Sequence, residues 1–191
     1  MKAPMLLLSF SAFFWAGTAG AQQTQEDSGS VTIDGTVTPL CMLGPPSRTS
    51  IDLGTLIATS GSRAGRMAQF GPQQITLPGS FCNFAGTSIS ISANAMLAAD
   101  DTIVPTGFAR AVNFTSTVTN WATEHAVVTT TASAAGDTST AEGSGGIMPA
   151  PHYADLPLTL SGFTAPGDNL LIAGTYTGTV TITLGPAETA Q

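Results

Sequence analysis

Apolar and polar residues alternate along several short stretches of the chain. The clearest is residues 175–184, where threonines stand at the odd positions and mostly apolar residues at the even ones. The same alternation is found in four other stretches: residues 31–37, 88–93, 112–118 and 156–160. A period of two puts successive side chains on opposite faces of a β-strand. The pattern therefore predicts half-buried strands at these places.

Weaker alternation predicts further strands at residues 51–56, 73–77 and 126–130. The composition agrees, because β-branched Thr, Val and Ile are common while the helix formers Glu, Lys, Gln and Arg are scarce. Residues 93–99 are the only candidate helix. Turns are marked by Gly and Pro at residues 44–46, 71–72, 78–79 and 166–168. About seven or eight short strands separated by turns predict an all-β fold, an antiparallel β-sandwich.

Residues 131–151 differ from the rest, since they are small, polar and aperiodic. This composition is typical of a long flexible loop between strands. A linker between two domains is the alternative, but the chain that follows is too short to hold a core of its own. We therefore expect a single sandwich domain over residues 31–185, preceded by a flexible extension at residues 22–30 and followed by a tail at residues 186–191.

The N-terminus has the features of a secretory signal peptide. Lys2 is followed by an apolar run at residues 5–16, and Ala19-Gly20-Ala21 provides the small residues that a signal peptidase requires. The run is shorter than the roughly 18–20 residues of a spanning helix, which disfavours a membrane anchor. We expect residues 1–21 to be removed. The protein would then be exported through the periplasm to the cell surface or a fimbrium, or be secreted, without membrane insertion after signal cleavage.

Charge excludes two classes of partner. The chain has five basic and twelve acidic side chains and a net charge of −7, and Lys2, its one lysine, lies in the predicted signal peptide. Binding to nucleic acid depends on Lys and Arg that displace counterions from phosphates, so no nucleic-acid partner is expected. Attraction to anionic lipid is disfavoured for the same reason.

The two cysteines, Cys41 and Cys82, both follow the predicted signal peptide. Export to an oxidising compartment makes a disulfide between them the expected state. Two free thiols or a metal site are the alternatives. A metal site needs more ligands at short spacing, and none stands near either cysteine.

No residues suggest an active site or a cofactor. The histidines, His125 and His152, do not stand at metal-ligand spacing from another His or Cys, and no Gly-x-Ser-x-Gly motif occurs. A weak calcium site at Asp100-Asp101 or Asp137 lacks the run of carboxylates that calcium requires. A sugar-binding face formed by Trp121, His152 and Tyr153 is less favoured than core packing. We expect no enzyme activity, no cofactor and no metal.

Several motifs resemble one family. They are the alternating strand at residues 31–37, the cysteines Cys41 and Cys82, the Asp52-Leu53-Gly54 element between them, and the final strand GTYTGTVTITL at residues 174–184. Together with the signal peptide, this arrangement resembles the pilin subunits of chaperone–usher fimbriae, including the spore-coat-U-like branch. It is also similar to secreted sandwich domains that share the Gly-Thr-Tyr-Thr-Gly-Thr ending.

The resemblance implies an immunoglobulin-like sandwich, of the pilin type, that lacks its last strand. A hydrophobic groove would then lie open beside the final strand. A periplasmic chaperone would fill this groove first. At an usher, the N-terminal extension of the next pilin-like subunit would then replace the chaperone. This is β-augmentation at an open sheet edge. The implied subunit contacts are Val31, Ile33, Val37, Tyr176, Val180, Ile182 and Leu184. The chain differs from many family members in its polar residues 22–30 and in ending without a penultimate aromatic residue.

Two functions follow as expectations. The first is a structural subunit of a fimbria or related extracellular assembly, joined by strand exchange between subunits. The alternative is a monomeric secreted or surface binding domain, such as an adhesin, that completes its own sandwich. The two differ in whether residues 31–37 pair within their own chain or in a neighbour.

Overall fold

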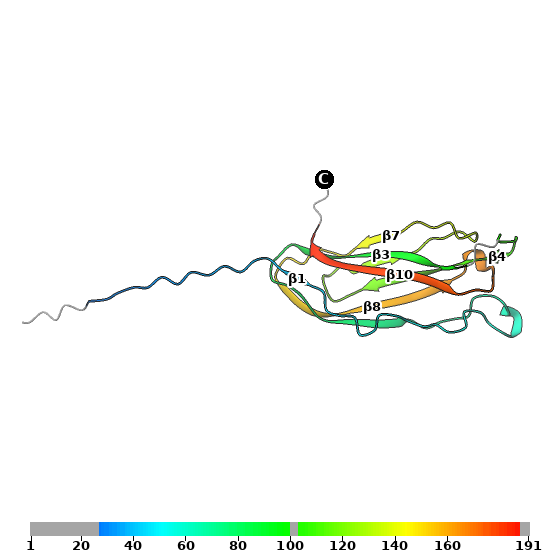
Figure 1. Cartoon of the computed structure of the whole chain (residues 1–191), viewed down its shortest axis with the longest axis horizontal. Helices are drawn as coiled ribbons and strands as arrows, with labels where there is room; N and C mark the ends of the chain where they lie inside the picture. Colours follow the sequence, from blue (N-terminus) through cyan, green and yellow to red (C-terminus); the bar gives the residue numbers. More distant parts are fainter. Residues whose placement is uncertain (1–26, 100–102, 188–191) are drawn as a thin grey trace, which may run out of the picture. The chain divides into compact units, whose positions relative to one another are not determined.

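The computed structural model describes residues 27–99 and 103–187 (Figure 1). The predicted signal peptide, most of the 22–30 extension, the Asp100-Asp101 pair and the last four residues lie outside this part. The chain divides into two compact units at Thr36 and Val37. The described residues of the first unit, 27–36, form neither helix nor strand.

The regular elements of the second unit are almost all strands. They are β1 (Cys41–Met42), β2 (Gln73–Cys82), β3 (Thr87–Ala98), β4 (Phe108–Ala109), β5 (Ala111–Val118), β6 (Ala126–Thr129), β7 (Ala141–Ser144), β8 (His152–Thr164), β9 (Leu170–Leu171) and β10 (Tyr176–Pro186). Two short 3-10 turns, η1 (Gly61–Arg63) and η2 (Pro166–Asp168), complete the elements of the described residues.

The strands form two layers that share β5. One layer has the order β1-β2-β8-β5-β6, and the other contains β10, β3 and β7. The start of β5 pairs with β3 through Ala111 and Val112, whereas its later residues pair with β8 and β6. Figure 1 shows β7, β3 and β10 in one layer and β8 in the other. Apart from the short parallel β4–β9 pair, the named pairs are antiparallel. The predicted antiparallel β-sandwich is confirmed.

The core lies between the layers, where the inward faces of the long strands meet. Its buried apolar residues include Leu77, Ile89, Ile91, Ala93, Phe114, Val118, Leu156 and Leu158. On β3 and β8 these residues are two apart, as the alternating pattern predicts. Phe114, on the alternating stretch at residues 112–118, is also part of this core.

The disulfide between Cys41 and Cys82 is confirmed. The two cysteines stand opposite each other in the β1–β2 pair. The bridge therefore fixes the start of the sandwich to the end of β2, and it closes a loop with a sequence separation of 41.

Most predicted strands are present, and several are longer than the pattern indicated. The stretches at 73–77, 88–93, 112–118, 126–130, 156–160 and 175–184 correspond to β2, β3, β5, β6, β8 and β10. The candidate helix at residues 93–99 is wrong, because β3 continues to Ala98. Met96 and Leu97 pair with the start of β5, so both edges of this part of β3 are occupied by strands.

The interpretation of residues 131–151 as one long loop is also wrong. Residues 141–144 form β7, which pairs with β3. Gly143 is one position here where a larger residue has no room, since a Cβ would lie 2.2 Å from the carbonyl oxygen of Val127. The glycine allows β7 to approach β6 closely, and small residues that appear loop-like in the sequence serve packing.

Residues 51–56 do not form the strand that was predicted. The chain before them runs beside β2, where the amide of Ser47 donates to the carbonyl oxygen of Thr76 at 2.7 Å. Strand pairing resumes only at Ile57, which forms an isolated bridge with Met67.

Gly44 lies at the beginning of the irregular chain that runs beside β2, and it is closely packed against that strand. Its amide donates to Ser80 Oγ at 2.9 Å, and a Cβ at Gly44 would lie 1.7 Å from the carbonyl oxygen of Pro78. We expect Gly44→Ala to lower the free energy of unfolding by about 1–3 kcal/mol, because the backbone must move to admit the methyl group. Gly71→Ala is the control, since nothing lies within 4 Å of that added Cβ. Chemical denaturation of both variants measures the effect, and equal stabilities would contradict the packing argument.

Candidate functional site

The last strand, β10, has one edge that no strand covers. It pairs with β3 from Tyr176 to Pro186, and it ends the strand order in the described part of the chain. Val180, Ile182 and Leu184 turn toward the core, while the threonines between them are exposed. An uncovered edge of this kind presents unpaired N–H and C=O groups along its length.

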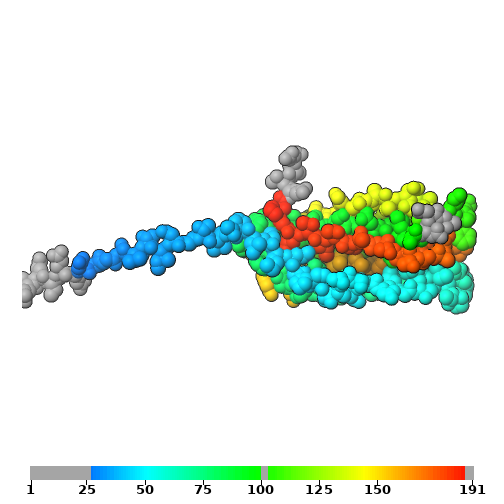
Figure 2. All heavy atoms as spheres, viewed as in Figure 1, coloured from blue at the N-terminus to red at the C-terminus, as the bar shows by residue number. Residues whose placement is uncertain are grey.

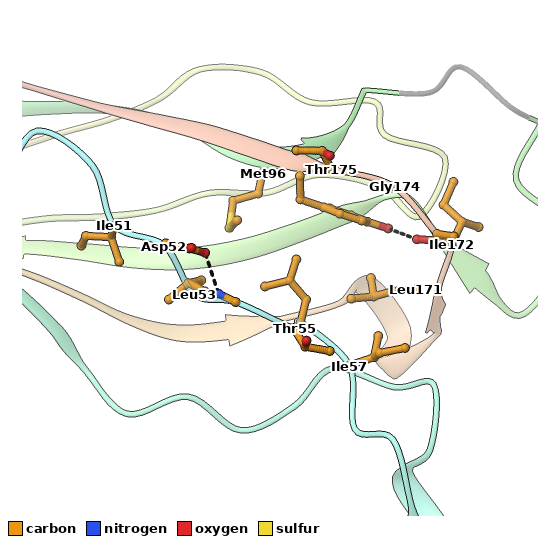
Figure 3. A pocket seen from close by; sticks show the side chains of 14 residues that line it. Ile51, Asp52, Leu53, Thr55, Ile57, Met96, Leu171, Ile172, Gly174 and Thr175 are labelled. Atoms are coloured by element: carbon orange, nitrogen blue, oxygen red, sulfur yellow. Dashed lines mark hydrogen bonds between the residues drawn. The ribbon is translucent and has the colours of Figure 1, made fainter.

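Residues 49–57, here called the 49–57 segment, form the wall that faces β10. The carboxylate of Asp52 accepts a hydrogen bond from the amide of Gly54 at 2.8 Å, and Gly54 has a φ of 67°. This turn needs a residue that tolerates a left-handed backbone, which explains the glycine of the Asp52-Leu53-Gly54 element. The turn directs the segment along the opening rather than into a sheet (Figure 3).

Between this wall and β10 lie two neighbouring cavities that share lining residues. One has a volume of about 450 Å³ and the other of about 360 Å³. Ile51, Leu53, Met96 and Tyr176 line both, so we treat the two as one groove. Figure 2 shows atoms of β8 within the furrow between β10 and the segment that precedes β2.

The floor of the groove is apolar, while the lining also includes the polar residues Thr49, Ser50, Thr55, Thr175 and Thr177. The side chains that contribute to the floor include Ile75, Phe114, Leu158, Leu160, Phe163 and Val180. Phe114 and Phe163 contact each other with ring centroids 5.9 Å apart. Asp52 is the only charged residue in the lining, and its carboxylate is engaged with Gly54. The groove therefore combines an apolar floor with a free strand edge.

Tyr176 lies where the two cavities of the groove meet, since it lines both. Its hydroxyl donates to the carbonyl oxygen of Ile172 at 2.9 Å (Figure 3). The carbonyl oxygen of Ala109 lies 3.3 Å from the same hydroxyl. Burial raises the pKa of Tyr176 above its ordinary value, although the charge of Arg110 opposes the shift. The phenol thus stays protonated at neutral pH and holds the start of β10 to the loop before it.

No family model matches the chain, and no curated protein or solved structure matches it either.

The implied contact residues fall into two groups. Tyr176, Val180, Ile182 and Leu184 lie together on the inward face of β10. Residues 31–37 do not form a half-buried strand in this chain, so that prediction is wrong for the isolated molecule. Val31, Ile33 and Val37 are instead 88%, 92% and 84% exposed.

The opposite wall of the groove was not predicted from the sequence. Ile51, Leu53 and Phe163 contribute to it from an irregular segment and from β8. The Asp52-Leu53-Gly54 element was the one sequence feature that could have indicated this wall. It suggested a resemblance to a family, but it did not show that these residues face β10. These residues come together only through the pairing of β2 with β8.

Among residues 27–99 and 103–187, the other candidate residues do not assemble into a site. Trp121 is 4% exposed and packs edge-on against His152, with the two ring centroids 5.0 Å apart. Tyr153, in contrast, is 69% exposed. The burial of Trp121 agrees with the core packing that the sequence favoured over a sugar-binding face. Asp137 bonds to Ser133.

Two further findings concern residues 27–99 and 103–187. Within them, no group of three or more His, Cys, Asp or Glu side chains is arranged to hold a metal ion. They also contain no helix with the length and apolar character to cross a membrane.

Proposed function

We propose that this protein is a structural subunit of a surface fimbria or related extracellular assembly, joined to its neighbours by exchange of a β-strand. The observation that carries the proposal is the apolar groove beside the uncovered edge of β10. A strand entering the groove would pair with the free N–H and C=O groups of β10. Its alternate side chains would fill the apolar floor.

The chain itself contains a segment suited to be that strand. Val31, Ile33 and Val37 alternate with polar residues and are exposed, so they gain by burial in a partner. Seven extended residues span about 23 Å, and the nine residues from Tyr176 to Leu184 span about 30 Å. The segment is thus long enough to cover most of the uncovered edge.

An open apolar groove has a cost before assembly. Uncovered edges pair with one another and aggregate unless something occupies them. A subunit of this kind therefore needs a carrier, and we propose a periplasmic chaperone that occupies the groove until an usher passes the subunit to its neighbour. Neither step requires catalysis or a cofactor. The expected localisation is the periplasm in transit and then the cell surface.

The test places a charge in the proposed donor segment. The chain beginning at Gln22 is refolded as wild type and as Ile33→Asp, and assembly is measured by size-exclusion chromatography. We expect the wild type to form oligomers and Ile33→Asp to lose at least nine-tenths of them, because a buried unpaired carboxylate costs several kcal/mol. Thr32→Asp is the matched control, with the same charge on the opposite face of the segment, and it should assemble like the wild type.

The opposite result would favour the alternative function. A wild-type chain that remains a stable monomer without any partner, and unfolds in one cooperative transition, would mean that the groove needs no donor. The protein would then be a secreted or surface binding domain that works alone. Equal loss of oligomers in Ile33→Asp and Thr32→Asp would also contradict strand exchange, since only one of these side chains faces the groove.

A further inference from the structure

Asn83 makes three hydrogen bonds to residues 38–40. These residues form the base of residues 22–37, here called the N-terminal extension. Its side-chain oxygen accepts from the amide of Leu40 at 2.7 Å, and its side-chain amide donates to the carbonyl oxygen of Thr38 at 2.9 Å. Its backbone amide donates to the carbonyl oxygen of Leu40 at 3.0 Å. Residues 38–40 are thereby fixed to the end of β2 as a continuation of β1, beside the disulfide.

A second feature stiffens the same residues. Pro39 has a fixed φ, and a residue that precedes proline, here Thr38, is restricted to extended conformations. Cys41 is bonded to Cys82, the neighbour of Asn83, so the two sides of the hydrogen-bonded contact cannot separate. The chain therefore leaves the sandwich at Thr38 in an extended conformation.

This exit lies near the C-terminal end of β10, beyond the β10 residues that line the two cavities. β1 contacts β10 and lies beside its C-terminal end (Figure 1). Leu43, just after β1, packs in the same cluster as Leu184. An extension that starts here has two grooves within reach, its own and that of another copy. Residues 22–37 span about 50 Å when extended, enough to run the length of its own β10.

The two routes differ in what they require of residues 38–40. To enter its own groove, the chain has to reverse direction at this point and then run parallel to β10. To enter the groove of a second copy, it needs no reversal. We propose that Asn83 is a positioning residue that blocks the reversal, and so directs the extension into a neighbouring copy rather than into its own groove. This inference rests on the proposed function.

The test compares the wild-type chain from Gln22 with Asn83→Ala. Both are refolded under identical conditions, and the ratio of monomer to oligomer is measured by size-exclusion chromatography. We expect Asn83→Ala to raise the monomer share several-fold, because the extension is then free to fold back. Asn94→Ala is the matched control, since Asn94 also makes two side-chain hydrogen bonds, to Thr179 and Thr140, at a site that does not touch residues 38–40.

A second measurement separates positioning from a general loss of stability. A fluorescent peptide with the sequence of residues 27–37 is added to the monomer fractions. The Asn83→Ala monomer should take up several-fold less peptide than the wild-type monomer, because its groove is already filled. Adding Ile33→Asp to Asn83→Ala should restore peptide uptake, since the extension then cannot enter. A merely weakened fold would not produce this restoration.

Each outcome has one meaning. An unchanged monomer share and unchanged peptide uptake in Asn83→Ala would overturn the role of Asn83, even if Ile33→Asp still abolishes assembly of the wild type. Assembly that survives Ile33→Asp would instead overturn the proposed function. If Asn83→Ala does not fold, Asn83→Asp replaces it. That variant keeps the acceptor for Leu40 but places a carboxylate against the carbonyl oxygen of Thr38, and it should shift both readouts in the same direction. A folded Asn83→Asp with wild-type behaviour would overturn the inference.

Discussion

The double variant Cys41→Ala/Cys82→Ala is expected to lose about 4 kcal/mol of its free energy of unfolding. The disulfide closes a loop with a sequence separation of 41, and the chain-entropy relation gives about this value for such a loop. For a domain of this size, that corresponds to a fall in melting temperature of about 10 °C. Replacing both cysteines avoids leaving a lone buried thiol, because Cys82 is buried in the core.

Calorimetry of the oxidised wild type and the double variant measures this change. Met42→Ala is a suitable control, because it alters the next residue of β1 at an exposed position without touching the bridge. Its melting temperature should stay within about 2 °C of the wild type. If the double variant has the same melting temperature as Met42→Ala, the β1–β2 pairing does not depend on the disulfide.

Truncating Leu156 is the second change expected to have a large effect. Leu156 is 0% exposed and lies on the inward face of β8, between strands on both sides. Leu156→Ala removes buried apolar atoms and leaves a cavity, because the paired strands cannot close in on it. We expect a loss of about 3–4 kcal/mol in the free energy of unfolding.

Chemical denaturation measures this loss of unfolding free energy, provided that the dependence of the free energy on denaturant concentration has the same slope in all variants. Leu40→Ala makes the same truncation at a side chain that is half exposed, and should cost less than about 1 kcal/mol. A similar cost at both positions would show that the sandwich has no tightly packed centre at Leu156.

The sequence identified the strands whose two faces differ in environment. β10 and β8 were predictable because one face meets the core and the other meets water, which selects alternating residues. The end of β3 was not predictable, because Ala93 and Ala95 on its buried face are alanines. Alanine favours helices, and it gives little contrast in hydrophobicity between the two faces of the strand. β7 was missed for a related reason, since its close approach to β6 requires Gly143 rather than a β-branched residue.

The groove shows a different limit. Its β10 side was predicted, because the candidate residues follow one strand. The opposite wall was not, because the weak alternation at residues 51–56 predicted a strand, whereas the Asp52–Gly54 turn shapes an irregular segment there. Its distance from β10 depends on the pairing of β2 with β8, and no local pattern encodes that pairing. The exposure of Ile33 was equally hidden, since an alternating segment has the same sequence whether it pairs in its own chain or in another.

The position of the disulfide also determines how the domain bears tension. A pull on the chain ahead of Cys41 passes through the sulfur–sulfur bond to Cys82 and then directly into β3. The loop between the cysteines, including the wall of the groove, carries none of this load, because a covalent bond does not extend under forces that separate strands. The Asn83 hydrogen bonds to Thr38 and Leu40 meet the force first. When the chain is also held at its C-terminal end, the long β3–β10 pair then shares the force along its whole length. The domain is thus braced so that stretching the N-terminus leaves the 49–57 wall in place.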